Sequence, residues 1–486
     1  MNKRSFRSVA GIFILWMVMF VPFLLISCQS EQVLTNPGDH LTFSKDTVSF
    51  DTVFSTVGTP TVWLKVRNQS SKPILIRSIR LKNGSNSNFH LLVDGVSGIR
   101  FDDVEIAPKD SIFLFVALNA VKQGTFSPVD VRDEILFQTD GPEKSIVLNA
   151  FSWDAEFMRG KVLTSDTTLT DDRPYVVYDS LVVGENATLN IQPGVRLFFH
   201  DKAYLKVNGR IVAMGTQAKP IQFRGDRLDK VIAAFPYDFY PGQWNYIYLA
   251  PTSSENLFEH VDIHGAYYGI IADSVHQGVQ LRMRNCKIHN MINSCIWGNS
   301  TQMELYNCQI SNSGSYTVAL IGGRTTMVHC TIANHQWIAT REGPALVLVN
   351  EMTDASYPSG YLGYPLYFRF TNSILSGSHE SELGFFKREG VAWDVQLSHS
   401  LLKTAQISAL YARTDSCLYN LNPKFLKLGS SSEGYICDFR IDSLSPAKDA
   451  GASSTLSNFP TDLNGISRNI DGKPDMGAYE WFPAQK

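Results

Sequence analysis

The chain has 486 residues, of which 44% are hydrophobic, 12% aromatic and 18% charged. This composition excludes a disordered chain, and the length exceeds what one compact core holds, so two or three globular units are expected. The formal charge is −3, and the cations Lys3, Arg4 and Arg7 all lie within the first 27 residues. The remainder is mildly acidic and has no basic cluster, which argues against a nucleic-acid partner, because phosphates require grouped Lys and Arg.

The first 27 residues begin with these cations and continue with an uncharged, apolar run from Ser8 to Ser27. Such an order is typical of a secretory signal peptide. The alternative is a transmembrane helix, because the run is close to the roughly 20 residues that a helix needs to cross a bilayer.

The residues around Cys28 favour the signal peptide. Leu25, Ile26 and Ser27 precede Cys28, and this pattern resembles the lipobox of bacterial lipoproteins. The resemblance implies that Cys28 is diacylated and becomes the mature N-terminus, so that outer-membrane lipid is a partner. Gln29 after the cysteine implies an outer-membrane location, on the periplasmic or the cell-surface side. Residues 28–40 are polar and turn-rich, and we expect them to form a lipidated tether.

Residues 41–157 have the pattern of a β-sandwich. Apolar and polar residues alternate over Val62–Arg67 and again near Ile112 and Ile135, with turn-forming clusters between these segments. The order resembles the immunoglobulin-like modules that precede repeat domains in exported bacterial proteins. A carbohydrate-binding module is the alternative. Because no concentration of aromatic residues on one face is evident, a spacer or docking domain is preferred.

An internal repeat determines the expected fold of the next region. Four segments align without gaps, and three of them place Cys286, Cys308 and Cys330 at intervals of 22 residues. Weaker copies follow at Asn372 and His399. A period this short does not fit helical repeats of 33 residues or more but fits one coil of a parallel β-helix, which buries its apolar face only by stacking on neighbouring coils.

The position of each residue within the repeat also predicts its direction. Ile288 and Cys286 are expected to point inward, and Asn285, Asn307 and Asn372 are expected to form a ladder at a tight bend, since Asn tolerates left-handed backbone geometry. Coils are about 4.8 Å apart, farther than the ~3.8 Å between the Cβ atoms of a disulfide. The three stacked cysteines are therefore predicted to be free thiols. Cys417 and Cys437 are a possible disulfide.

Two further stretches resemble known β-helix proteins. Pro193-Gly194-Val195, Asn208-Gly209 and Lys219-Pro220-Ile221 resemble the opening coils of right-handed β-helix proteins, the pectate-lyase-like fold. Residues 445–480 resemble the closing segment of choice-of-anchor Q proteins. That resemblance implies a C-terminal cap over residues 441–486, although the acidic residues and glycines there leave calcium binding as an alternative. The predicted fold is all-β, with a right-handed single-stranded parallel β-helix over residues 158–440 after the N-terminal sandwich.

Right-handed β-helices include polysaccharide lyases and glycoside hydrolases, which need grouped carboxylates on an outward face. The outward file that the repeat predicts is Ile271, Trp297 and Ala319, which contains none. We therefore expect a protein that is not an enzyme and that presents a binding face to a polysaccharide or a protein. The alternative is a lyase or hydrolase acting on uronic-acid-type glycans.

One outward group of polar residues could carry chemistry. His260, Asp262 and His264 alternate along one predicted strand, and His289 lies on the next coil. The spacing places His264 about 5 Å from His289 and about 7 Å from Asp262. Asp262, His264 and His289 are thus a candidate metal or proton-transfer site. The alternative is an ordinary solvated polar face.

Aromatic residues form a second candidate site. Trp297 and Trp337 recur near successive coils, and an insertion before Asn372 holds Tyr361 and Tyr364. A groove lined by these rings and covered by a loop would suit sugar binding. The alternative is that the rings fill the core. No organic cofactor is expected.

Overall fold

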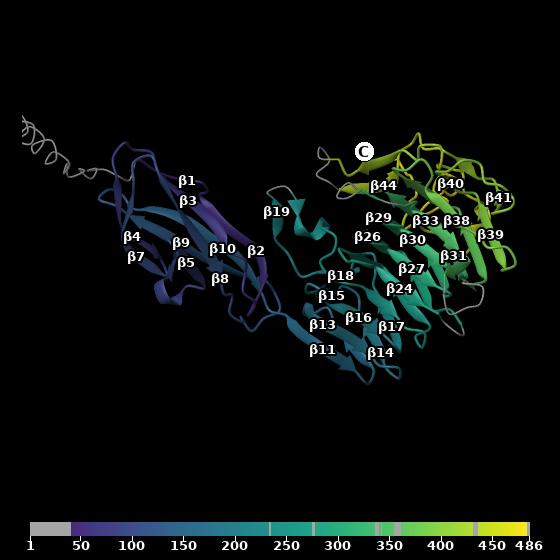
Figure 1. Ribbon diagram of the computed structural model, residues 1–486, viewed down its shortest axis with the longest axis horizontal. Coiled ribbons are helices and arrows are strands. Elements are labelled where there is room, and N and C mark those ends of the chain that lie inside the picture. Colours follow the sequence, from purple (N-terminus) through teal and green to yellow (C-terminus); the bar gives the residue numbers. More distant parts are fainter. Residues whose placement is uncertain are drawn as a thin grey trace, which may run out of the picture. The chain divides into compact units, whose positions relative to one another are not determined.

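The computed structural model describes residues 40–232, 235–274, 278–335, 340–341, 343–353, 361–430 and 436–483. The chain divides into two compact units, one over residues up to 153 and one over residues 154–486, with residues 124–127 assigned to the second. The predicted signal peptide and Cys28 lie outside the described residues. Within the described residues, no helix combines the length and apolarity that crossing a bilayer requires. Figure 1 shows both units built almost wholly from strands.

The first unit is a sandwich of two five-stranded sheets, as the alternating pattern predicted. One sheet has the order β1-β3-β8-β5-β6 and the other β2-β10-β9-β4-β7, and a single apolar core lies between them. Neighbouring strands are antiparallel except β2 and β10. The strands of the unit are β1 (Leu41–Phe43), β2 (Thr47–Phe54), β3 (Val62–Asn68), β4 (Ile74–Leu81), β5 (Phe89–Val93), β6 (Val96–Gly98), β7 (Arg100–Ile106), β8 (Ser111–Leu118), β9 (Val129–Gln138) and β10 (Lys144–Trp153), with a short 3-10 helix η2 (Gly84–Asn86).

The outward side of the first sheet corrects one interpretation of the sequence. Trp63 on β3 lies opposite Phe115 on β8, with Phe113 two residues away, and the three rings are 48%, 36% and 46% exposed. Aromatic residues are therefore concentrated on one face of this unit. The alternation of apolar and polar residues correctly predicted which side chains of β3 point outward. Because β8 is apolar on both faces, its sequence did not show that Phe113 and Phe115 point outward and not into the core.

The second unit is a right-handed parallel β-helix whose coils each contribute three strands. β11 (Glu156–Leu163) and β13 (Tyr175–Val183) open the column. The first face consists of β16 (Tyr204–Val207), β21 (Ile247–Leu249), β24 (Ile270–Asp273), β27 (Ile296–Asn299), β30 (Val318–Ile321), β33 (Leu346–Val349) and β38 (Leu383–Phe386). The second face consists of β12 (Thr167–Leu169), β14 (Thr188–Ile191), β17 (Arg210–Met214), β22 (Asn256–Glu259), β25 (Leu281–Arg284), β28 (Gln302–Tyr306), β31 (Gly323–Val328), β36 (Leu366–Thr371), β39 (Trp393–Ser398) and β41 (Arg413–Asp415).

The third face carries the candidate site. It consists of β15 (Arg196–Phe199), β18 (Ile221–Gly225), β23 (Val261–His264), β26 (Lys287–Met291), β29 (Gln309–Ser313), β32 (Thr331–Asn334), β37 (Ile374–Gly377), β40 (Leu401–Leu402) and β42 (Leu418–Tyr419). Short pieces outside the coils are β19 (Lys230–Ile232), β20 (Phe235–Pro236), the 3-10 helix η3 (Tyr237–Phe239), β34 (Glu351–Thr353) and β35 (Tyr361–Gly363). The last coil strand, β42, ends at Tyr419, so the coils stop before residue 440.

The bend between the second and third faces confirms the predicted register. Asn285, Asn307 and Asn372 all have positive φ, at 53°, 52° and 49°, which is the left-handed geometry expected of Asn. The Asn307 amide donates to the Asn285 carbonyl oxygen at 3.1 Å. His329 takes the bend position between Asn307 and Asn372. The 22-residue period stacks the bend residues from Asn285 to His329, and Asn372 keeps the same register after an insertion.

The cysteines inside the column are also as predicted. Cys286, Cys308 and Cys330 are fully buried free thiols in the main core of the coil. No disulfide joins Cys417 and Cys437, so the possible disulfide between them is wrong. Cys417 directs its sulfur to the Leu397 carbonyl, whereas Cys437 lies on a strand outside the coils and accepts from Asn312.

The C-terminal segment, residues 425–430 and 436–483, contacts the side of the column. It opens with the antiparallel pair β43 (Phe425–Leu428) and β44 (Cys437–Ile441) and includes the 3-10 helix η5 (Ser453–Thr455). Ala452 donates its backbone N–H to Asn372, Arg468 donates to Asn307, and Tyr479 donates to Gln309. The predicted cap over residues 441–486 is corrected accordingly, because this segment covers the bend and the third face rather than only the last coil.

Candidate functional site

The outward residues of the third face change from polar to apolar along the column. Asp262 is in register with Lys287, which is in register with Gln309, and the next members of this file are Thr331 and Ile374. Ile374 packs against Ile441, Ala447 and Met476 of the C-terminal segment. The apolar end of the face is therefore closed by that segment, and the polar end remains for a ligand.

Two histidines and two carboxylates form a network at this polar end. Asp262 Oδ1 lies 3.0 Å from His264 Nδ1 and 3.0 Å from His289 Nε2. His264 Nε2 lies 2.8 Å from Asp238 Oδ1, and Asp238 on η3 also pairs with Arg224 at 2.8 Å. The two imidazole rings stack with centroids 5.0 Å apart. Arg224 belongs to β18, so three successive coils and one insertion supply the network.

The contacts of His264 identify its charge state. Both ring nitrogens face carboxylate oxygens, so both carry protons and donate. Burial alone would lower the pKa of His264, but the charges of Asp262 and Asp238 raise it to about 9. Burial works against ionisation of Asp262 too, yet His289 and His264 hold its pKa well below the usual range. His264 is thus a buried imidazolium held between two carboxylates.

This geometry confirms one prediction and corrects two. His264 and His289 are neighbours at the predicted spacing. Asp262, expected about 7 Å from His264, bends toward it and accepts at 3.0 Å, so the face is a connected and largely buried network rather than a solvated surface. His260 is not part of it, because its φ of 47° places it at the bend, where it contacts Asn285.

Asp262, His264 and His289 are the described residues whose ligand atoms could surround a metal ion, since these atoms lie within 4.8 Å of one another. A metal needs a lone pair from each imidazole. His264 has none to give while both of its nitrogens donate to carboxylates. The observed hydrogen bonds therefore fit an ion-pair network better than a metal centre.

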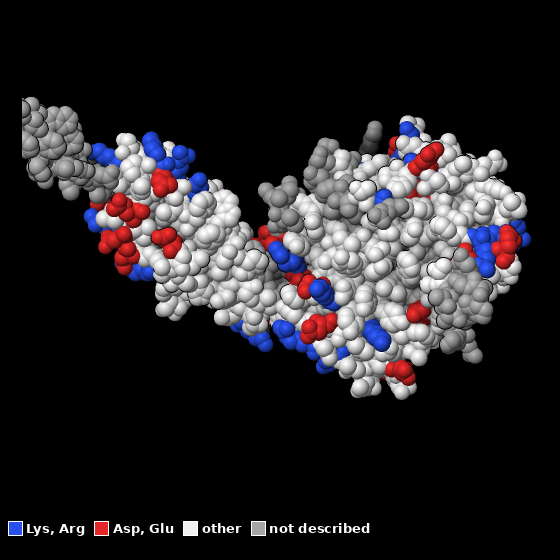
Figure 2. Space-filling view, in the orientation of Figure 1, with Lys and Arg blue, Asp and Glu red and all other residues white. Residues whose placement is uncertain are grey.

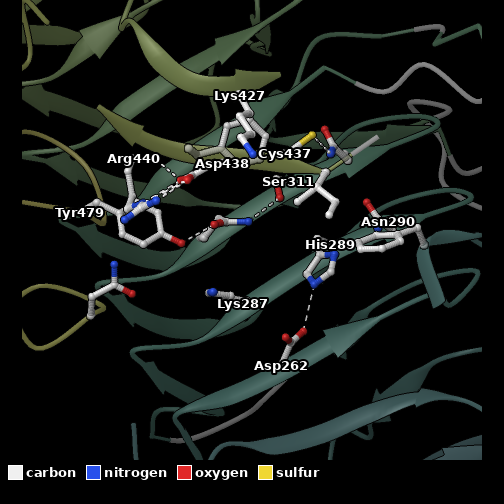
Figure 3. Close-up of a pocket in the computed structure, with 16 residues that line it drawn as sticks. Asp262, Lys287, His289, Asn290, Ser311, Lys427, Cys437, Asp438, Arg440 and Tyr479 are labelled. Carbon is white, nitrogen blue, oxygen red and sulfur yellow. Dashed lines mark hydrogen bonds and ion pairs between the residues drawn. The ribbon is translucent and has the colours of Figure 1, made fainter. Parts of the chain in front are cut away.

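A cavity of about 430 Å³ lies beside this network, between the third face and the C-terminal segment, and we call it the lateral cavity. Figure 3 shows Asp262, Lys287 and His289 on the coil side, with Lys427, Asp438 and Arg440 opposite them on β43 and β44. The remaining lining residues are Phe239, Asn290, Gln309, Ser311, Asn312, Ile436, Cys437, Phe439, Asn464 and Tyr479.

The polar groups of the lateral cavity differ in how far they are already engaged. Arg440 pairs with Asp438 at 2.6 Å. Gln309 accepts from Tyr479 and donates to Ser311 Oγ at 3.0 Å, so its amide is held in place. Lys287, in contrast, forms no hydrogen bond or ion pair with any of the residues described. A half-buried ammonium group of this kind is an unneutralised positive charge facing the cavity.

Two of the aromatic candidates, Trp297 and Tyr364, have side chains that the structure describes. Trp297 lies on β27 in the predicted outward file with Ile271 and Ala319, and its ring meets Tyr268 edge-on at 6.4 Å. Tyr364 lies in the turn before β36, next to Gly322. Trp337 lies outside the described residues, and of Tyr361 only the backbone in β35 is described. Trp297 and Tyr364 belong to different elements, and the predicted groove, which needs Trp337 and Tyr361 as well, stays a prediction.

The described acidic residues near the C-terminus already accept hydrogen bonds, which leaves few carboxylate oxygens as ligands for calcium. Asp462 accepts from the backbone N–H groups of Asn464, Ile466 and Glu480, and Asp475 accepts from those of Asp449 and Trp481. The fully buried Arg468 lies among them and donates to Glu480 at 3.2 Å. The guanidinium group supplies the positive charge that a calcium ion would otherwise bring.

Several residues of the site were not expected from the sequence. Asp238 lies in an insertion between two coils, and Asp438 and Arg440 lie beyond the last coil, so no repeat predicts their position. Tyr479 was noted only within the closing motif. No signal in the sequence says which face the residues after residue 425 cover.

Comparison with known proteins adds little to this description. No family model matches the chain, and no curated protein matches it. Matching solved structures include pectate lyase Pel9A, 13% identical over 68% of this chain and 88% of that chain with a TM-score of 0.29. Another is the catalytic unit of a thermostable GH87 alpha-1,3-glucanase from Streptomyces thermodiastaticus strain HF3-3, 8% identical over 78% and 83% with a TM-score of 0.25. Similarity this low carries no argument about function, so the β-helix assignment rests on the strand pairing.

Proposed function

We propose that this protein is an outer-membrane lipoprotein, anchored through acylated Cys28, that binds an acidic saccharide in the lateral cavity without cleaving it. The observation that carries the proposal is the unneutralised Lys287 inside a cavity of ligand size. Binding sites for small ligands usually combine apolar walls with a few placed polar groups. The lateral cavity has more polar than apolar side chains in its lining, which suits a ligand rich in hydroxyl groups better than an apolar one.

The polar groups suit a sugar that bears a carboxylate. Lys287 and Lys427 supply ammonium groups from opposite sides, and hydrogen bonds to charged groups contribute about 1.5–3 kcal/mol each. Asn290 and Ser311 offer hydrogen-bonding groups to hydroxyls. Because Gln309 and its neighbours are already fixed by hydrogen bonds, a ligand would meet a preorganised surface.

The walls also suit a pyranose ring. Phe239 lies at the edge near η3, and Ile436 and Phe439 belong to the C-terminal side. The C–H faces of a sugar are apolar and pack on such side chains, whereas its edges carry the hydroxyls. A uronic-acid-type glycan presents both kinds of surface and a negative charge.

The test is a calorimetric titration of the protein with oligogalacturonate and with neutral oligosaccharides of equal length. Lys287→Gln is expected to weaken oligogalacturonate binding at least tenfold, because it removes a charge-assisted hydrogen bond. The matched control is Lys161→Gln, which alters an exposed lysine on β11. Equal affinity of both variants for the acidic glycan would overturn the proposed site.

Catalysis at the same site is the second candidate, and one observation favours it. Asp262 accepts from His289 Nε2 at 3.0 Å, which leaves Nδ1 as the nitrogen that can accept a proton. A carboxylate that orients an imidazole in this way is a common general-base arrangement. Release of reducing ends or unsaturated products during the titration, abolished by His289→Gln, would establish an enzyme instead of a binding protein.

The proposed anchor has its own measurement. Mass spectrometry of the N-terminal peptide from the membrane-bound protein is expected to show Cys28 as the first residue with acyl chains attached. Cys28→Ala is expected to abolish the acyl mass and membrane retention after a high-salt wash, because two or more acyl chains are needed for stable anchoring. An N-terminal peptide that retains residues 1–27 would contradict the proposal.

A further inference from the structure

The outward side of the first sheet of the sandwich carries exposed rings, which we call the aromatic face: Trp63, Phe113 and Phe115. The rings of Trp63 and Phe113 meet edge-on with centroids 5.9 Å apart, and all three residues are at least 36% exposed. Scattered apolar residues are ordinary on a surface, but a contiguous aromatic group is typical of an interaction site.

Positive charge surrounds these rings. The Lys45 ammonium group lies 5.1 Å from the centroid of Trp63, and that of Lys65 lies 5.5 Å from the centroid of Phe113. Arg67 follows on the outward side of β3. The outward positions of β3 and β8 hold no carboxylate.

The opposite sheet is of mixed charge. Its strands β7 and β9 carry the acidic residues Asp102, Asp103, Glu105, Asp130, Asp133 and Glu134, and arginines of β4, β7 and β9 pair with several acidic groups of this sheet. Figure 2 shows Lys and Arg along the edge of this unit where β1 and β3 lie, and acidic and basic groups together over β4, β7 and β9. An anionic surface would therefore be attracted to the aromatic face more than to the other side.

The tether limits where this face can go. Only 11 residues lie between Cys28 and His40, at which the described part of the sandwich begins. At no more than about 3.6 Å per residue, they reach roughly 40 Å. If Cys28 is acylated, as the proposed function holds, the sandwich stays within that distance of the bilayer.

We propose that the aromatic face is a membrane-docking surface that binds anionic phospholipids and holds the sandwich flat on the bilayer. Trp and Phe rings favour the interfacial zone of a membrane, and nearby Lys and Arg are attracted to anionic headgroups. The combination of rings, cations and a short lipidated tether favours a bilayer over a soluble partner.

The experiment uses residues 29–486, which keep both units and lack the acyl chains. Sedimentation with vesicles of phosphatidylethanolamine and phosphatidylglycerol is expected to show binding that falls with salt and is much weaker on phosphatidylcholine. The double variant Trp63→Ala/Phe113→Ala is expected to bind at least tenfold more weakly. Lys45→Gln/Lys65→Gln, which keeps the rings, is expected to lose most of the preference for phosphatidylglycerol.

The matched control is Phe151→Ala, which removes an equally exposed ring from the opposite sheet and is expected to bind like the unmodified chain. Melting temperatures identify any variant that fails to fold. No binding of the unmodified chain, or equal binding of all variants, overturns the proposal. Loss of oligosaccharide binding instead of vesicle binding in the face variants also overturns it and assigns the face to a glycan. None of these outcomes depends on acylation of Cys28 or on the lateral cavity.

Discussion

Replacing Arg468 with Met is expected to destabilise the β-helix by about 3 kcal/mol at pH 8, because it leaves buried hydrogen-bond acceptors without a donor. Arg468 is fully buried and donates to Glu480 at 3.2 Å, to Asn307 at 3.0 Å and to the Gly477 carbonyl at 3.0 Å. Methionine fills a similar volume but leaves these acceptors without a donor. The C-terminal segment then loses its link to the bend of the column.

The loss of stability caused by Arg468→Met is expected to become smaller as the pH falls. Burial, aided by Asp475, raises the pKa of Glu480 to about 9 although Arg468 opposes this, and burial raises the pKa of Asp475 to about 6. Glu480 is therefore neutral at both pH 5 and pH 8, whereas Asp475 is ionised at pH 8 and mainly neutral near pH 5. A neutral Asp475 needs no cation beside it, so the cost of losing Arg468 is smaller near pH 5 than near pH 8.

Urea unfolding at about pH 5 and about pH 8, with the transition of the β-helix fitted by itself, measures both effects. The control is Arg440→Met, which removes a partly exposed arginine of the same segment and is expected to cost at most about 1 kcal/mol. A change of less than 1 kcal/mol for Arg468→Met at pH 8 would show that the C-terminal segment does not depend on this residue.

The His264 network is expected to make the β-helix less stable in alkali. The pKa of His264 is about 9 in the folded chain, against 6.5 for a free imidazole. Because the folded pKa is the higher one, the stabilisation is fully present below about pH 6.5 and is lost as the pH rises through 9. A shift of this size corresponds to about 3 kcal/mol.

The free energy of unfolding is measured near pH 6 and near pH 10 for the unmodified chain, His264→Gln and Asp262→Asn. His264→Gln removes the titrating group, so its curve is expected to lack this decrease. Asp262→Asn leaves Asp238 as the only carboxylate partner and is expected to retain part of it. A decrease of the same size in all three proteins would assign it to other groups.

The fold was largely predictable because its rules are local and repeat. A 22-residue period, an Asn at the bend and an inward Cys recur at Asn285 and Asn307, and each copy confirms the others. Strand register then follows, because a slip by one residue would turn every apolar side chain outward.

Only part of the site was predictable, because only part of it lies on the repeating coils. Asp262, His264 and His289 lie on regular coils, so their neighbours follow from the period. Asp238 and Arg440 lie outside the repeat, and their positions depend on how an insertion and the C-terminal segment fold back over the third face. Distances between side chains depend on rotamers as well as on strand register. The Asp262 side chain turns toward His264, so the two are in hydrogen-bond contact instead of at the separation of alternate residues along a strand.

The reach of the C-terminal segment bears on the order in which the cavity can form. Gln309 and Tyr479, whose side chains meet at the lateral cavity, are separated by 170 positions in the chain. The column can wind coil by coil from its N-terminal end, but the cavity gains its second wall only after the C-terminal segment has folded back over the third face. A protease that removes this segment would leave the coils in place and the lateral cavity open on one side.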